Sequence, residues 1–210
     1  MPQKYNAIIF DLGGVLYDID TQRTKDAFAR IGLDDFNQFY TLEQQIHLFD
    51  SLEKGLIDEA AFVEGINKIS GKALNAEQVK QAWNALLIGM PGENIDLLKE
   101  LKNEDYALYL LSNTNIYHYS AIQQELKRNF GLNALDDLFD KAYYSFQIGM
   151  RKPDAEIFQF VMKSSALDPD KTVFIDDNED NIKASLSVGL PAIHKQKHIS
   201  LPELLDRFVF

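Results

Sequence analysis

Acidic side chains, a lysine and a hydroxyl follow short apolar runs at several points of the sequence. In chain order these residues are Asp11, Ser112, Asn113, Lys152, Asp176 and Asp177. Clustered carboxylates repel one another unless a cation lies between them, and oxygen ligands without His or Cys favour Mg²⁺. A lysine and a hydroxyl beside such a cluster suit an anionic substrate, of which phosphate is the obvious example. In that setting Asp11 could act as a nucleophile and form a phospho-aspartate.

These residues share one position in the predicted structure, the carboxyl end of a buried strand or the loop after it. Open parallel sheets bind ligands outside the carboxyl ends of their strands. Strands are predicted at residues 7–10, 106–111, 141–144, 172–175 and 191–193. Helical patterns lie between them, including one that starts with Pro153 at its first position. The alternation predicts an α/β fold, a Rossmann-like parallel sheet with both faces covered.

Residues 18–90 break the alternation, because they contain helical signals and no recognisable strand. A stretch of this length exceeds ordinary connections and is long enough for a small helical bundle. We therefore expect a core of residues 1–17 and 91–210 with an inserted helical cap of residues 18–90. One cap helix is expected to begin with Phe36, Phe39, Tyr40 and Leu42, and the core of the bundle is expected to include Trp83. The cap residues considered for substrate contact are Arg23, Lys25, His47 and Lys54.

Composition excludes several functional classes. The chain has 210 residues, with 21 Lys and Arg against 32 Asp and Glu, a formal net charge of −11. That balance argues against nucleic acid and anionic membranes as partners. The absence of cysteine excludes disulfides, thiolate nucleophiles and iron–sulfur clusters. No apolar run approaches the length of a membrane span, and no signal-peptide pattern opens the sequence, so a reducing cytoplasm is the expected compartment.

The segments that carry the polar residues at the strand ends resemble four motifs of the haloacid dehalogenase-like (HAD) superfamily, whose members are mostly Mg²⁺-dependent phosphatases. The matching segments are Phe10-Asp11-Leu12-Gly13-Gly14-Val15-Leu16, Leu110-Leu111-Ser112-Asn113-Thr114, Gly149-Met150-Arg151-Lys152-Pro153-Asp154 and Phe174-Ile175-Asp176-Asp177-Asn178. They occur in the family's order and span nearly the whole chain. Four spaced motifs are a far more specific signal than any one of them.

The resemblance implies a role for each matching residue. Asp11 is expected to be the nucleophile and a metal ligand, with the carbonyl oxygen of Gly13 as a further ligand. Ser112 and the backbone amide of Asn113 are expected to bind a phosphoryl oxygen. Lys152 is expected to balance charge between Asp11 and the phosphate. In the fourth motif Asp177 is the preferred metal ligand, with Asp176 contacting the metal or its waters.

The first motif departs from the family pattern at Gly13, where the pattern has a second Asp that protonates the leaving group. Loss of general acid–base catalysis typically costs about 10²–10⁴-fold in rate. Three readings follow. Another group takes over the role, with Asp18 and Asp20 as candidates, or the leaving group needs little protonation, as in an anomeric or acyl phosphate. The third reading is that the protein is not catalytic. A branch of the family with Asp-x-Gly in this motif includes sugar-phosphate phosphatases.

The sequence therefore predicts a Mg²⁺-dependent phosphatase of a small phosphorylated metabolite, with a sugar phosphate favoured, acting as a monomer or homodimer. Two alternatives remain. One is a non-catalytic homologue that binds a phosphometabolite or a partner protein. The other is a 2-haloacid dehalogenase, which needs no metal and which the paired Asp176 and Asp177 argue against.

Overall fold

A five-stranded parallel sheet forms the centre of the computed structural model, which describes residues 4–33 and 43–208. The strand order is β5-β4-β1-β6-β7. The strands are β1 (Ala7–Phe10), β4 (Ala107–Ser112), β5 (Lys141–Tyr144), β6 (Thr172–Asp176) and β7 (Ala192–His194). All four pairings are parallel, so the carboxyl ends meet at one edge. The predicted α/β class is confirmed, and each predicted strand lies within one residue of an observed strand.

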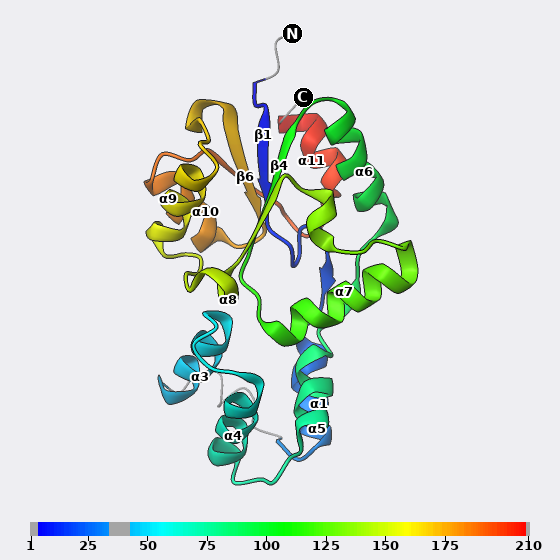
Figure 1. The fold of residues 1–210 in the computed structure, drawn as a ribbon, viewed down its shortest axis with the longest axis vertical. Coiled ribbons are helices and arrows are strands. Elements are labelled where there is room, and N and C mark those ends of the chain that lie inside the picture. Colours follow the sequence, from blue (N-terminus) through cyan, green and yellow to red (C-terminus); the bar gives the residue numbers. More distant parts are fainter. Residues whose placement is uncertain (1–3, 34–42, 209–210) are drawn as a thin grey trace.

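Both faces of the sheet are covered by helices (Figure 1). Ile8 and Phe10 of β1 face a cluster that includes side chains of α6, α7 and α11, whereas Ile9 faces a cluster with α9. The alternation arises because successive side chains of a strand point to opposite faces. The covering elements are α6 (Gly92–Asn103), α7 (Ile116–Phe130), η1 (Leu135–Leu138), α8 (Ser145–Ile148), α9 (Ala155–Ser164), η2 (Pro169–Lys171), α10 (Glu179–Ser187) and α11 (Leu201–Phe208).

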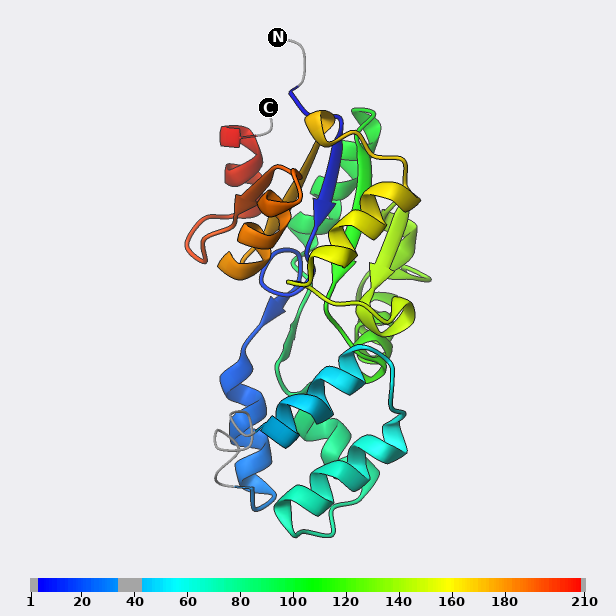
Figure 2. The same ribbon diagram turned by 90° about the vertical axis from the view of Figure 1, so that its left-hand side faces the viewer.

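The described helices encoded between β1 and α6 form a separate group at the carboxyl edge of the sheet, seen from two sides in Figures 1 and 2. They are α1 (Thr21–Arg30), α3 (Glu43–Glu53), α4 (Glu59–Ser70) and α5 (Ala76–Asn84). Trp83 lies in their own hydrophobic cluster, where it stacks on Phe49 at 5.0 Å between ring centroids. The expectation that Trp83 is a core residue is therefore correct. The helical pattern beginning at Phe36, Phe39, Tyr40 and Leu42 lies outside the described residues.

Two short strands join this helical group to the sheet, which corrects the expectation of no strand between residues 18 and 90. β2 (Asp18–Ile19) pairs antiparallel with β3 (Leu87–Gly89), and the Asp20 N–H donates to the Leu86 carbonyl at 2.9 Å. Strands of two and three residues are too short to show a period, so the sequence pattern misses them. The two chain crossings between sheet and helices thus lie side by side.

The predicted start of α9 at Pro153 is also wrong. The helix begins at Ala155, because its N-cap residue Asp154 has an extended backbone (φ −60°, ψ 129°) that separates Pro153 from the first turn. Pro153 instead follows a cis peptide bond from Lys152.

Among the described residues, no helix combines the length and the apolar character that crossing a membrane requires.

Candidate active site

The candidate site lies at the carboxyl edge of the sheet, where three neighbouring strands deliver polar residues. Asp11 follows β1, Ser112 ends β4 and Asp176 ends β6, and each of the three is buried. The Asp11 N–H donates to the carbonyl of Ile175 in β6 at 2.9 Å, so the sheet ladder itself fixes the backbone of Asp11. These residues come together because parallel strands share a direction.

Lys152 is the electrostatic centre of the site. Its ammonium donates to Asp11 Oδ1 at 2.5 Å, to Asp176 Oδ2 at 2.7 Å and to the Leu111 carbonyl at 2.8 Å. Its side chain is 1% exposed. Burial by itself lowers the pKa of Lys152, but Asp11 and Asp176 outweigh that effect and hold the pKa above its ordinary value. The lysine is therefore a fixed positive charge between two carboxylates.

Asn113 holds the loop that carries Lys152. Its side-chain amide donates to the Lys152 carbonyl at 2.7 Å, and its side-chain oxygen accepts from the Lys152 N–H at 2.9 Å. Both ends of the side chain are therefore occupied, and only the backbone N–H of Asn113 is available for the phosphate contact that the resemblance implies. The sequence did not reveal this positioning contact, because 39 positions separate the two residues.

Ser112 lies close to the first-motif loop. Together with Gly13 and Asn113, it lines a small cavity of about 70 Å³. Its side chain is almost fully buried, and its hydroxyl makes no hydrogen bond to any residue that the structure describes. The hydroxyl is thus placed beside the loop of Asp11 with its hydrogen-bonding capacity unused.

Three carboxylates could hold a divalent cation. Oxygen atoms of Asp11, Asp176 and Asp177 all lie within 4.8 Å of one another. Burial, together with the charges of Asp176 and Asp177, raises the pKa of Asp11 to about 7 even though Lys152 opposes the shift. A set of hard oxygen donors with an excess of negative charge fits Mg²⁺. The Gly13 carbonyl, the fourth predicted ligand, accepts no backbone hydrogen bond from the described residues.

The two neighbouring aspartates have different environments. Asp176 is fully buried, and its carboxylate accepts hydrogen bonds from Lys152, Asn181 and the N–H of Asn178. Asp177 is more exposed than Asp176, and the lost hydration of its carboxylate, together with the charge of Asp176, raises its pKa. The Asp177 carboxylate thus has fewer protein partners than that of Asp176, and the preference for Asp177 as a metal ligand stays a prediction.

The first-motif loop passes very close to Asp177. Gly14 has a φ of +81°, and a Cβ atom added there would lie 2.2 Å from Asp177 Oδ2. The second glycine of the Gly13-Gly14 pair is therefore required both by its left-handed backbone and by the space that Asp177 occupies.

Space beside Gly13 is also filled. A Cβ atom at this position would lie 3.1 Å from the Cδ1 of Ile19, so the place of the family's second Asp is partly taken by an aliphatic side chain. Of the two candidate substitutes, Asp20 caps α1 by accepting from the Gln22 N–H, and Asp18 lies exposed in β2. Both line a neighbouring pocket with Asp177 rather than the cavity beside Ser112.

The helical group contacts the loop of Lys152 directly. Arg151 pairs with Asp50 at 2.9 Å and with Glu53 at 3.1 Å, both on α3. Lys54, one of the cap residues considered for substrate contact, instead pairs with Asp50 at 3.3 Å and with Asp154 at 3.7 Å. These ion pairs place α3 over the loop between β5 and α9.

A second contact joins the helical group to the start of α7. The Tyr117 hydroxyl donates to the Glu59 carbonyl at 3.0 Å, and His118 Nε2 lies 3.1 Å from the Trp83 carbonyl. The Asn115 side chain bonds His118 Nδ1 at 3.1 Å, so a neutral ring with its proton on Nε2 satisfies both contacts. Burial lowers the pKa of His118 to about 4.

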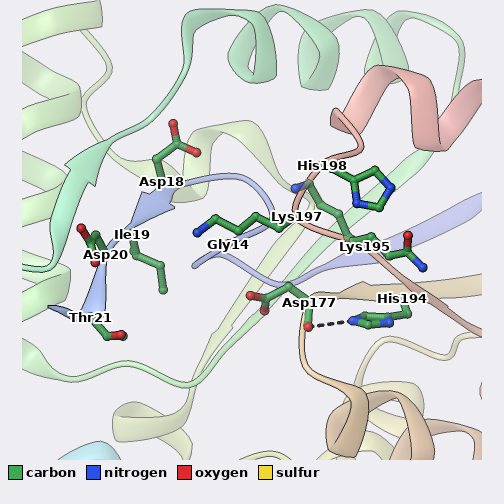
Figure 3. Close-up of a pocket in the computed structure, with 11 residues that line it drawn as sticks. Gly14, Asp18, Ile19, Asp20, Thr21, Asp177, His194, Lys195, Lys197 and His198 are labelled. Carbon is green, nitrogen blue, oxygen red and sulfur yellow. Dashed lines mark hydrogen bonds between the residues drawn. The ribbon is translucent and has the colours of Figure 1, made fainter.

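A pocket of about 680 Å³ opens beside Asp177. Figure 3 shows Asp18, Asp20 and Thr21 on one side of it, and His194, Lys195 and His198 on the other, with Asp177 between them. His194 Nε2 lies 2.9 Å from the Asp177 carbonyl, which ties the loop after β7 to the site.

Comparison with known proteins agrees with this geometry. A profile of haloacid dehalogenase-like hydrolases matches residues 5–189. The chain is 35% identical over 183 residues to a D-ribitol-5-phosphate phosphatase of Bacteroides thetaiotaomicron, covering 87% of each chain.

Two solved structures are similar along nearly their whole length. A HAD family enzyme from Bacteroides thetaiotaomicron, bt-2542, in complex with magnesium and inorganic phosphate, superposes with a TM-score of 0.84 at 34% identity, covering 95% of this chain and 98% of that one. A HAD-like family hydrolase from Porphyromonas gingivalis has a TM-score of 0.87 at 30% identity, with 97% of each chain covered.

Proposed function

The chain belongs to the haloacid dehalogenase-like hydrolases, and on that premise we propose that it is a Mg²⁺-dependent phosphatase of a small phosphorylated metabolite. The observation that carries the proposal is the position of Lys152 between Asp11 and Asp176, with a third carboxylate beside them. A fixed cation next to a carboxylate nucleophile and an oxygen-rich cation site is the arrangement that phosphoryl transfer requires.

Asp11 is the proposed nucleophile. One of its carboxylate oxygens forms a bond to phosphorus as the bond to the leaving-group oxygen breaks, which gives an aspartyl phosphate. Lys152 donates to the other oxygen, Oδ1, and so orients the carboxylate. Water then cleaves the aspartyl phosphate and releases inorganic phosphate, which restores Asp11.

Two groups on the loop after β4 are proposed to hold the phosphoryl oxygens, namely the Ser112 hydroxyl and the Asn113 N–H. The Asn113 side chain is proposed to act through Lys152, because its hydrogen bonds hold the Lys152 backbone in place. Asp11, Asp176, Asp177 and the Gly13 carbonyl are the groups that would hold Mg²⁺. When bound, Mg²⁺ supplies a Lewis acid that offsets negative charge on the phosphoryl oxygens.

The substrate class that we propose is a sugar phosphate or sugar-alcohol phosphate. A relative that is 35% identical over most of the chain is a D-ribitol-5-phosphate phosphatase, and the family match alone specifies no substrate. We treat residues 18–90 as the cap that covers the bound substrate. No side chain at Gly13 can protonate the leaving group, so a low-pKa leaving group is expected to speed the chemical step, and a preference for a sugar-alcohol phosphate has to come from binding of its hydroxyl groups.

Phosphate release measured across sugar, sugar-alcohol, acyl and aryl phosphates, with Mg²⁺ or with EDTA, tests the proposal. We expect Mg²⁺-dependent release that falls at least 10³-fold in Asp11→Asn, because the amide is a poor nucleophile. Asp170→Asn is the matched control, since Asp170 is exposed on η2 before β6.

Each alternative function gives a different result in the same assay. Halide release from a 2-haloacid in EDTA would replace the proposal with dehalogenation. Phosphate or Mg²⁺ binding without release from any ester would indicate a binding protein.

A further inference from the structure

The hydrogen bonds and ion pairs described between the helical group and the sheet domain lie on one side of the candidate site. They go to the start of α7 and to the loop before α9, on the β4 and β5 side. Among the residues that the structure describes, none joins α1, α3, α4 or α5 to β6, β7 or the loop after them. The pocket of about 680 Å³ lies on the other side, between the start of α1 and the His194–His198 segment.

One wall of the pocket is the loop from His194 to His198, with the sequence His-Lys-Gln-Lys-His. It contains no acidic residue, in a chain whose formal net charge is −11. Neither Lys195 nor Lys197 forms a side-chain hydrogen bond or an ion pair with any described residue. Their ammonium groups are therefore free to donate to a bound molecule.

The opposite wall carries acceptors. Asp18, Asp20 and Thr21 lie there, at the junction between β2 and α1 (Figure 3). One carboxylate oxygen of Asp20 caps α1, which leaves the other available. Among the described residues that line the pocket, Ile19 carries the one aliphatic side chain, and all the others except Gly14 carry a hydrogen-bonding group.

A wall of donors facing a wall of acceptors matches the chemistry of neighbouring hydroxyl groups, each of which both donates and accepts hydrogen bonds. Asp177 lines the same pocket, which connects it to the proposed metal site. We propose that this pocket is the leaving-group subsite, in which Lys195 and Lys197 bind one side of a polyhydroxylated chain and Asp18 and Asp20 bind the other. The inference rests on the proposed phosphatase function and assigns specificity to a loop of the sheet domain as well as to the cap.

The test compares ribitol 5-phosphate with phenyl phosphate in Lys195→Ala/Lys197→Ala and in Asp18→Asn/Asp20→Asn. Asparagine retains the N-cap of α1, so the second variant keeps the helix start. We expect the ratio of kcat/KM for ribitol 5-phosphate to kcat/KM for phenyl phosphate to fall at least tenfold in each variant, because a site built to bind hydroxyls loses its discrimination when the partner groups are removed. The double variant Lys163→Ala/Lys171→Ala, at two exposed lysines, is the charge-matched control.

Calorimetric titration of each variant in an Asp11→Asn background gives a readout that does not depend on turnover. Binding of ribitol 5-phosphate should weaken at least tenfold, with a smaller change for inorganic phosphate. Equal weakening for both ligands would overturn the inference, since the lysines would then attract the phosphate alone. An unchanged specificity ratio would also overturn it. Absence of turnover of every ester by the unmodified protein would instead contradict the proposed function.

Discussion

Lys152 shows how far individual site residues could be predicted. Its place beside Asp11 in the candidate site was predictable, because each of the two belongs to a short motif beside a strand or loop. The groups that contact Lys152 were not predictable. The ammonium is shared by Asp11, Asp176 and the Leu111 carbonyl, and the backbone is held by Asn113, at separations that no local pattern encodes. Removing one partner of such a buried charge is strongly destabilising.

The Gly14→Ala variant tests the close approach of the loop after β1 to Asp177. The new Cβ would lie 2.2 Å from Asp177 Oδ2 and the backbone has a φ of +81°. We expect a loss of about 1–3 kcal/mol in the free energy of unfolding, as for other strained backbone positions. Weaker Mg²⁺ binding should accompany it, because Asp177 must move.

Gly131→Ala is the matched control for that measurement. Gly131 also has a left-handed backbone (φ +67°), but nothing lies within 4 Å of its added Cβ. Urea unfolding should show a cost for both variants, whereas Mg²⁺ titration should show an effect for Gly14→Ala alone. Normal Mg²⁺ affinity in Gly14→Ala would contradict the proposed role of Asp177.

Among the elements, the strands of the central sheet were predictable, whereas the two strands at the junction with the helical group and the start of α9 were not. β1 and β6 are continuous apolar runs and match the prediction closely. β2 and β3 have two and three residues and were missed. The prediction placed the start of α9 at Pro153, because proline is common at the first position of a helix. In the structure Asp154 is the N-cap, and the helix begins at Ala155. The preference of a residue type for a helix position does not predict the backbone where a distant contact fixes it, as Asn113 fixes the backbone of Lys152.

Helix α7 supplies a pH-dependent contact between the sheet domain and the helical group. His118 has a folded pKa of about 4 against an ordinary value of 6.5, so the unfolded chain binds more protons between these values. The free energy of unfolding should therefore fall as the pH is lowered from about 6.5 to 4. At pH 5 the loss attributable to His118 is at most about 2 kcal/mol.

His118→Gln is the variant that checks this dependence, because glutamine can still donate to the Trp83 carbonyl but does not titrate. Urea midpoints at pH 7.5 and pH 5 should differ less in the variant than in the original protein. The same pH difference in both proteins would show that other groups produce it.

The molecule as a whole combines an acidic surface with a concentrated negative charge at one edge of the sheet. When all groups are ionised, Lys152 balances only one of the three clustered carboxylates. A cation that binds the folded chain and not the unfolded chain stabilises it by mass action, by about 2.7 kcal/mol at 100 times the dissociation constant.

Mg²⁺ should accordingly raise the Tm by about 5–10 °C at that concentration, given the usual scaling for a chain of this size. Differential scanning calorimetry with a Mg²⁺ series, reversed by EDTA, measures the shift. Asp177→Asn should lose most of it, and Asp170→Asn should retain it. A shift of the same size in Asp177→Asn would place the cation elsewhere.

Because β2 and β3 lie side by side, the chain leaves and re-enters the sheet domain at neighbouring points, and the helical group can be replaced as one segment. The Asp20 N–H and the Leu86 carbonyl meet at 2.9 Å, so the cut ends of the sheet domain lie as near to each other as the two legs of a hairpin. A different insert, or a two-residue turn, can be grafted between them without lengthening the chain path. Such a graft must cover Ile116 and Tyr117 of α7, which pack into the cluster of the helical group, and must supply new partners for Arg151 and His118. Exchange of this one contiguous segment would therefore change the helical side of the proposed substrate site and leave Asp11, Ser112, Lys152 and the His194–His198 loop in place.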